Sequence, residues 1–264
     1  MIIDFHTHIF PPEVRDNREE YIRRDTTFAE MYSDPRAQIA TAEDLLASME
    51  RAGVDISVAL GFAWQEHDLI VRHNEYLFEA AAQSDGVLIP FTSINMLDPR
   101  AEREIDRCAA DGVRGVGELR PDNQGWKLAG EAGERLAALA RRHNLILMFH
   151  VTEPEGHEYP GRSGCDMEVF SAFAARNSDL RIIGAHLGGD LYRRQPDPPN
   201  VYVDTAAQVF LYREAAAETA MRAVPPGRLL FASDAPLIRQ VRQIDEIRSV
   251  FHDPEERAAI LGGN

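Results

Sequence analysis

Residues 131–151, EAGERLAALARRHNLILMFHV, place an amphipathic helical pattern directly in front of a short apolar strand pattern. Glutamates open the helical part, and Arg141 and Arg142 lie near its end, a distribution of charge that suits the helix dipole. The apolar run Leu145–Val151 follows at once. A helix that leads straight into a buried strand is typical of parallel β/α proteins.

The same unit recurs along the whole chain. Eight apolar β-rich runs are found at Ile2–Ile9, Ile56–Phe62, Val87–Ile94, Val113–Leu119, Leu145–Val151, Arg181–Leu187, Val201–Ala206 and Leu229–Ser233. Helical patterns alternate with them at Ala42–Ala52, Asp68–Ala82, Arg100–Ala110, Glu131–His143, Met167–Arg176, Arg213–Ala223 and Val241–Phe251. Eight alternations in 264 residues predict an α/β fold, a (β/α)8 TIM barrel with one domain over residues 1–264. Catalytic groups would then lie at the carboxyl ends of the strands.

Two long connections would lie on that side of the barrel. Residues 11–41 form an insertion after the first strand, which we interpret as a lid or substrate wall, with a solvated surface excursion as the alternative. Residues 153–164 form a second loop after the fifth strand.

Charge and composition exclude several classes of partner. The chain has 28 basic and 43 acidic residues, a net charge of −15, which disfavours nucleic acid and membrane surfaces. Its two cysteines lie outside any Cys-x-x-Cys motif, and no signal peptide or membrane span is evident. These features predict reduced thiols and a cytoplasmic location.

The first strand carries Asp4, His6 and His8, which strict alternation would place on one face. Two neutral imidazoles at this spacing can share one divalent metal ion. Asp4 is expected beneath them as a hydrogen-bond acceptor.

Residue types that bind metals also end four further strands: Glu118, His150, His186 and Asp234. Taken together they favour a metal centre. Taken singly, Glu118 could be a buried carboxylate paired with Arg120 or Arg114, and Asp234 could cap the following helix. Asp204, at the end of the seventh strand, is interpreted as a turn or helix cap.

The order of these residues resembles the amidohydrolase superfamily, in the branch that includes aminocarboxymuconate-semialdehyde decarboxylase. Phrases similar to that branch run along the chain: MIIDFHTHI at 1–9, GHEYPG at 156–161, AHLGG at 185–189, VDTAA at 203–207 and SDAPL at 233–237. The resemblance implies a (β/α)8 barrel and a catalytic divalent ion, zinc above all, with manganese or another ion as the alternative. It also implies a small carboxylated or cyclic substrate and a homodimer.

The resemblance assigns roles to individual residues. His6, His8 and His150 look like metal ligands, and Asp234 like a ligand or the acid/base. His186 is similar to a general base or electrophile in members with one metal, and to a ligand of the second ion in members with two.

The metal count depends on the fourth strand. Many members with two metals bridge the ions with a carboxylated lysine on that strand, but Lys127, the chain's only lysine, lies beyond the strand end. Glu118 would take the bridging or ligating role instead, which leaves one or two ions open. We expect Arg120, His157, Tyr159 and Arg162 to hold the substrate, because arginine forks suit carboxylates.

These features predict first a metal-dependent hydrolase that uses metal-activated water on a small ester, lactone or amide. The alternative is a metal-dependent non-oxidative decarboxylase of an aromatic or semialdehyde acid. A barrel that binds a small molecule without catalysis is disfavoured, because every metal-ligand position expected from the resemblance still carries a suitable residue. Related metal-dependent deoxyribonucleases also place a glutamate at the position of Glu118, but the net charge of −15 argues against a nucleic-acid substrate.

Overall fold

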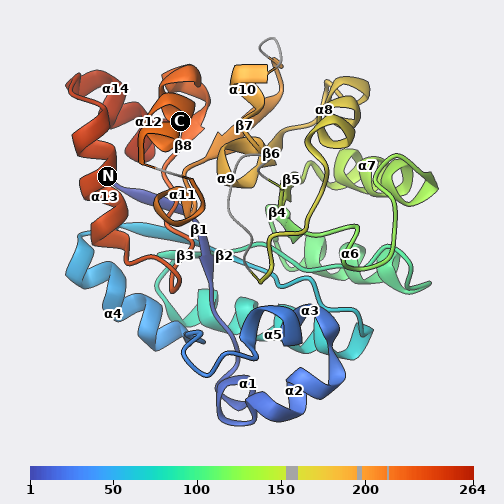
Figure 1. The fold of residues 1–264 in the computed structure, drawn as a ribbon. Helices are drawn as coiled ribbons and strands as arrows, with labels where there is room; N and C mark the ends of the chain where they lie inside the picture. Colours follow the sequence, from blue (N-terminus) through green and yellow to red (C-terminus); the bar gives the residue numbers. More distant parts are fainter. Residues whose placement is uncertain (153–159, 195–197, 213) are drawn as a thin grey trace.

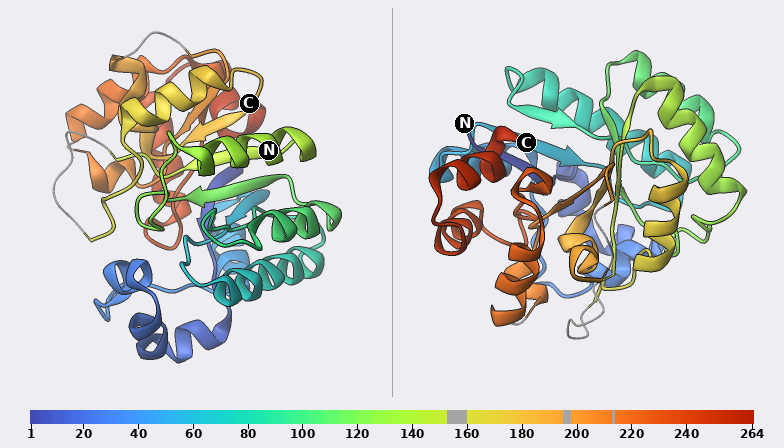
Figure 2. Two further views of the ribbon diagram at one scale, coloured as in Figure 1. Left: turned by 90° about the vertical axis from the view of Figure 1, so that its right-hand side faces the viewer. Right: turned by 90° about the horizontal axis from the view of Figure 1, so that it is seen from above.

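The computed structural model describes residues 1–152, 160–194, 198–212 and 214–264, which form a parallel β-barrel surrounded by helices (Figures 1 and 2). The strands are β1 (Ile3–His8), β2 (Ile56–Leu60), β3 (Leu88–Pro90), β4 (Gly115–Leu119), β5 (Ile146–Phe149), β6 (Ile182–Gly184), β7 (Val201–Asp204) and β8 (Leu229–Leu230). They pair in parallel as β1-β2-β3 and β4-β5-β6-β7-β8. Bridges between Thr92 and Val116 and between Thr7 and Ala235 join the two sheets into a closed barrel. The predicted TIM barrel is therefore confirmed.

The predicted helices between the strands are present almost residue for residue. They are α4 (Ala42–Ala52), α5 (His67–Gln83), α6 (Ala101–Ala110), α7 (Glu131–His143), α8 (Met167–Arg176), α12 (Glu214–Ala223) and α13 (Gln240–Val250). Local signals explain the bounds: Thr41 and Asp44 form a capping box before α4, and Asn144 ends α7 in a left-handed conformation. Short elements that the sequence pattern did not predict are α9 (Ala185–Gly188), α10 (Leu191–Arg194), α11 (Gln208–Leu211) and α14 (Pro254–Ala258).

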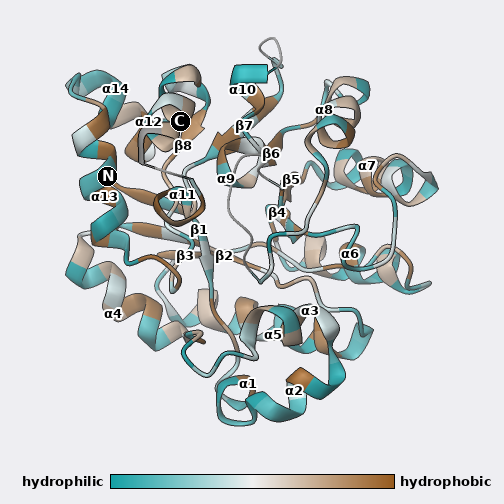
Figure 3. Cartoon of the chain, viewed as in Figure 1, coloured by the Kyte–Doolittle hydropathy of each residue, from teal (hydrophilic) through white to brown (hydrophobic). Residues whose placement is uncertain are grey.

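Alternation along the strands produces two apolar layers. Val58, Phe91 and Met148 face the barrel interior, whereas Leu147 and Phe149 pack outward against the helices. In Figure 3 the strands are largely hydrophobic, while the helices also carry hydrophilic patches. Within the described parts of the chain, no helix is both long and apolar enough to span a membrane.

An irregularity in β1 overturns the expectation for Asp4. The pairing with β2 shifts between Asp4 and Thr7, which breaks strict alternation. Asp4 therefore faces outward, where it accepts hydrogen bonds from the Ser233 hydroxyl at 2.5 Å and from Gln240 of α13 at 2.8 Å. It links β1 to the segment after β8 and to α13, where the barrel closes, and it does not contact the imidazole rings.

Residues 11–41 contain three short helices at the carboxyl end of β1: α1 (Pro12–Asp16), α2 (Arg18–Arg24) and α3 (Thr26–Tyr32) (Figure 1). They are held to the barrel by an aromatic cluster, which we define as Phe10, Phe28, Tyr32, Phe62 and Trp64. The Phe28 ring stacks on Trp64 at 5.1 Å and on Tyr32 at 4.6 Å between centroids. This cluster covers part of the barrel mouth.

Candidate active site

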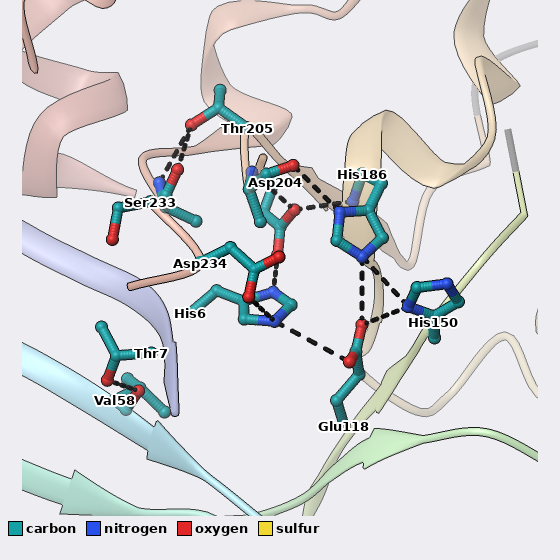
Figure 4. A network of polar contacts seen from close by, with 12 residues as sticks. His6, Thr7, Val58, Glu118, His150, His186, Asp204, Thr205, Ser233 and Asp234 are labelled. Atoms are coloured by element: carbon teal, nitrogen blue, oxygen red, sulfur yellow. Dashed lines mark hydrogen bonds and ion pairs between the residues drawn. The ribbon is translucent and has the colours of Figure 1, made fainter. Parts of the chain in front are cut away.

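Six of the side chains expected at the site meet at the carboxyl end of the barrel, and Figure 4 labels all of them except His8. They come from β1, from β4 and from the segments directly after β5, β6 and β8: His6, His8, Glu118, His150, His186 and Asp234. Five of them are buried, and Asp234 is partly exposed. The barrel thus turns positions far apart in the chain into one polar cluster inside an apolar shell.

The first group in this cluster is His6, His8 and Asp234. The Nε2 atoms of His6 and His8 lie 3.0 Å apart. The Oδ1 atom of Asp234 lies 3.6 Å from His6 Nε2 and 3.4 Å from His8 Nε2. Three ligand atoms therefore surround one point, as a metal centre requires.

The second group is Glu118, His150 and His186. Glu118 Oε1 lies 3.0 Å from His150 Nδ1 and 3.3 Å from His186 Nε2, and these two nitrogens are 3.1 Å apart. The other oxygen of Glu118, Oε2, lies 3.9 Å from the Nε2 atoms of both His6 and His8. Glu118 therefore spans the two groups.

Acceptors behind the rings fix how two histidines present their nitrogens. His6 Nδ1 lies 2.9 Å from a carboxylate oxygen of Asp204, and His186 Nδ1 lies 2.9 Å from the carbonyl oxygen of Ala206. Because these oxygens accept, each Nδ1 carries a hydrogen, and each Nε2 either binds a cation through its lone pair or carries the second proton of the charged ring. Asp204 also accepts the backbone N–H of His186 at 2.8 Å.

This donor set fits a divalent metal ion. In the neutral ring, the Nε2 lone pair of His186 faces the Glu118 carboxylate, and two acceptors at that distance repel unless a proton or a metal ion lies between them. His8 Nδ1 is buried and has no hydrogen-bond partner among the described residues. Imidazole nitrogens with carboxylate oxygens are ligands that zinc and manganese accept.

The electrostatics of the cluster also favour a cation. Burial acts to lower the pKa of His6, but the charges of Glu118 and Asp234 raise it to about 10. Burial likewise opposes protonation of His186, yet its hydrogen bond to Glu118 and the charge of that residue raise its pKa to about 9. Burial lowers the pKa of His150 to about 4. The carboxylates thus strongly favour positive charge between them.

The backbone is strained at two of these residues. His186 and Asp234 adopt left-handed conformations with φ of 59° and 65°. For residues with a side chain such conformations cost about 1–3 kcal/mol and gather at functional sites. The strain aims both side chains into the cluster from chain segments that have already left the barrel.

Asp204 is a member of the site that sequence reasoning interpreted as a cap. Its position at the end of β7 was the available signal, but its contacts with His6 and His186 depend on the closed barrel.

We expect Asp204→Asn to weaken metal binding about 10- to 100-fold, because loss of the acceptor frees the His6 ring. Titration with Mn²⁺ against a competing chelator measures this. Asp245→Asn on exposed α13 is the control, and equal affinity in both variants would contradict the assignment.

Arg120 lies beside the cluster, where it is almost fully buried. Its guanidinium donates to the carbonyl oxygens of Gly161 and Ser163. It also lines a small cavity together with His8 and Tyr32, a residue of the aromatic cluster that the sequence did not single out. Arg120 therefore both fixes the loop after β5 and faces the space next to the cluster.

The other residues expected to hold substrate are placed as follows. Arg162 is half-buried, and its carbonyl oxygen lies 3.4 Å from His150 Nε2. His157 and Tyr159 lie outside the described residues. Lys127 is exposed and pairs with Asp122 at 2.6 Å, so it takes no part in the cluster.

Solved structures with a similar fold include two decarboxylases and one probable hydrolase. The 5-carboxyvanillate decarboxylase of Sphingomonas paucimobilis is 18% identical, with a TM-score of 0.74 over 99% of this chain and 96% of that one. A 5-carboxyvanillate decarboxylase of Novosphingobium aromaticivorans, solved with manganese and 3-methoxy-4-hydroxy-5-nitrobenzoic acid, is 15% identical, with a TM-score of 0.76 over 99% and 94%. A protein of Acinetobacter baumannii described as a probable 2-pyrone-4,6-dicarboxylic acid hydrolase, with citric acid bound, is 13% identical, with a TM-score of 0.70 over 99% and 96%.

The likeness to these structures concerns the fold, and the family follows from the sequence itself. No curated protein matches the chain. The family model described as Amidohydrolase, however, matches residues 3–264. This match confirms the resemblance drawn from the strand-end residues, and the chain belongs to the amidohydrolase family.

Proposed function

We propose that the chain is a metal-dependent carboxy-lyase that releases carbon dioxide from an aromatic carboxylic acid without oxidation. The proposal rests on the two groups of histidine and carboxylate side chains that could hold a metal ion, and on the space of about 620 Å³ that opens beside His8. The decarboxylases among the similar structures support this alternative better than the hydrolase that the sequence first predicted.

The metal ligands in this proposal are His6, His8, Glu118, His150 and His186, and Asp234 faces the same point as the proposed acid. Within the first group, His6, His8 and Asp234 converge on one point, and Glu118 leads to the second group, with His150 and His186. A bound divalent ion supplies Lewis-acid chemistry there, which favours binding of a carboxylate and stabilises negative charge on the substrate.

The surrounding residues orient the substrate and exclude water. Tyr32, Phe62 and Met31 line a small cavity next to His8, of about 10 Å³, which has room for about one water molecule. An aromatic ring would therefore lie in the wider space of about 620 Å³ that His8 also lines, beside the apolar Ile39, Pro236 and Ile238. The helices α1–α3 cover this side through the aromatic cluster, so charges within act at low dielectric. Arg120 in the small cavity provides a fixed positive charge near a bound acid.

Asp234 is the proposed proton donor. Decarboxylation replaces the bond from ring carbon to carboxylate by a bond from ring carbon to hydrogen, so one proton must reach that carbon as carbon dioxide leaves. Asp234 faces the cluster and is partly exposed, with its side chain 14% accessible. It can therefore deliver a proton to the ring carbon and take another from solvent.

The second candidate is the hydrolase, and the position of Glu118 favours it. Its carboxylate reaches both groups, as expected of a residue shared by two ions. In this case Asp234 would accept a proton from the attacking water and pass it to the leaving group. The similar structure described as a pyrone hydrolase supports this candidate.

Replacement of Glu118 by glutamine separates the two candidates. If the chain is a decarboxylase with one ion, we expect Glu118→Gln to retain one ion per chain and to lower kcat less than about tenfold. If it is a hydrolase with two ions, the variant loses one ion and about 10³-fold in kcat. Elemental analysis and steady-state kinetics measure both quantities, with the exposed Glu19→Gln as control.

A substrate screen tests the proposed function. The manganese-loaded protein is incubated with hydroxybenzoates and methoxylated benzene dicarboxylates, and with a matched set of lactones and esters. We expect carbon dioxide and an equal amount of ring product from at least one acid. Acid formation from the lactones or esters, without carbon dioxide from any acid, would replace this proposal by the hydrolase.

A further inference from the structure

A large groove leads away from the candidate active site. It has a volume of about 620 Å³ and is bordered by the segment that holds α1 and α2, by α4 and by the residues before α13. His8 of the metal cluster lines its inner end. In Figure 1, α4 and α13 lie side by side on this flank of the barrel. A single aromatic ring would leave most of this space unfilled.

The charge of the groove is opposite to that of the chain. The chain has 43 acidic against 28 basic residues, yet the groove is lined by five arginines and one acidic residue, Asp44. Two of the arginines are neutralised, because Arg15 pairs with Asp44 at 3.2 Å and Arg36 with Asp34 at 2.7 Å. The other three define what we call the arginine groove.

The arginine groove consists of Arg18, Arg51 and Arg239, none of which forms an ion pair with a described residue. The guanidinium of Arg18 donates to the carbonyl oxygens of Asp34 at 3.1 Å and Ala37 at 2.7 Å. These neutral acceptors hold the side chain in place and leave its charge uncompensated. The three cations come from α2, α4 and the residue before α13, so the fold brings them together across distant parts of the chain.

We propose that the arginine groove binds a second acidic group of the substrate, a carboxylate or a phosphate, while the reacting carboxylate lies beside His8. The position of the reacting carboxylate rests on the proposed function, whereas the anion site in the arginine groove does not. Guanidinium groups bind both kinds of anion through paired hydrogen bonds. The substrate would then be an extended acid with at least two anionic groups, and not a simple benzoate.

The first experiment measures anion binding without catalysis. Metal-free protein is titrated calorimetrically with inorganic phosphate and with propane-1,2,3-tricarboxylate, so that no anion can bind through a metal ion. We expect the Kd of the better-bound anion to rise about tenfold in the Arg51→Ala/Arg239→Ala double variant, since each exposed ion pair contributes modestly. Tighter binding of phosphate would indicate a phosphorylated acid, and tighter binding of the tricarboxylate a polycarboxylic acid.

Two further variants test whether charge in the groove is responsible. Arg103→Ala removes an exposed arginine of α6 outside the groove and is expected to leave Kd unchanged. Arg51→Lys/Arg239→Lys keeps the charge and is expected to bind within about threefold of the unmodified protein. No binding of either anion, or equal Kd values in the alanine double variant and the unmodified protein, would overturn the inference.

The second experiment separates this inference from the proposed function. In the manganese-loaded protein, the alanine double variant is expected to raise KM for an acid with a second anionic group about tenfold and to change kcat less than about twofold. KM for a monoacid stays the same. Anion binding that depends on the arginines, without carbon dioxide from any acid, would refute the decarboxylase but retain the groove. Carbon dioxide release with unchanged KM for the diacid would refute the groove alone.

Discussion

Removal of divalent metal is expected to abolish turnover, lowering kcat at least about 10³-fold. The physical reason lies in the cluster itself. The neutral rings of His6 and His186 direct their Nε2 lone pairs toward the Glu118 carboxylate. Without a metal ion, these groups bind protons instead. Protonated imidazoles keep their hydrogen bonds to Asp204 and Ala206, but they have no lone pair left with which to bind a metal ion.

Dialysis against a chelator, followed by assay, measures this loss. Addition of Mn²⁺ or Zn²⁺ in slight excess should restore kcat, and addition of Mg²⁺, which prefers oxygen ligands, should restore much less. His143→Ala removes a half-buried histidine of α7 that pairs with Asp106 outside the cluster, and it is compared with His6→Ala as the control for the loss of any histidine. Full activity after the metal content has fallen below a tenth of an equivalent per chain would contradict the metal assignment.

Asp234→Asn is expected to lower kcat about 10²- to 10⁴-fold while KM and metal content change little. Asparagine occupies the same volume and can still offer an oxygen toward His8, but it has no proton to give to the ring carbon. The dependence of kcat on pH should also change, since the group that must be reprotonated from solvent is lost.

Steady-state kinetics over pH and elemental analysis of the same samples test this role. Asp245→Asn on the exposed face of α13 serves as the matched control. If excess Mn²⁺ restored kcat in Asp234→Asn, Asp234 would act as a metal ligand only, and another group would have to supply the proton.

The sequence predicted the barrel and its strand-end residues for a physical reason. The alternation of helix and strand identifies the carboxyl end of each strand, and in a closed parallel barrel all these ends meet. Glu118, His150 and His186 could therefore be grouped without knowledge of any contact. The helices with strong caps, such as α4, were predicted with their bounds.

What the sequence could not predict depends on local irregularity and on tertiary contacts. The shift in β1 pairing that turns Asp4 outward leaves no trace in the pattern of apolar residues. The short helices α1–α3 lack the repeated apolar stripe of longer helices, since their buried rings, such as Phe28, pack in one small cluster. Asp204 can accept hydrogen bonds from both His6 and His186 only once β1, β6 and β7 are brought together in the closed barrel.

The origin of the atoms in the product distinguishes decarboxylation from hydrolysis. The manganese-loaded protein is given an acid identified in the screen, once in D2O and once in water labelled with oxygen-18, and the product is analysed by mass spectrometry and NMR. Decarboxylation predicts one deuterium at the ring carbon that carried the carboxylate and no oxygen-18 in the ring product. Incorporation of one oxygen-18 atom, with no deuterium at that carbon, would show hydrolysis and refute the decarboxylase.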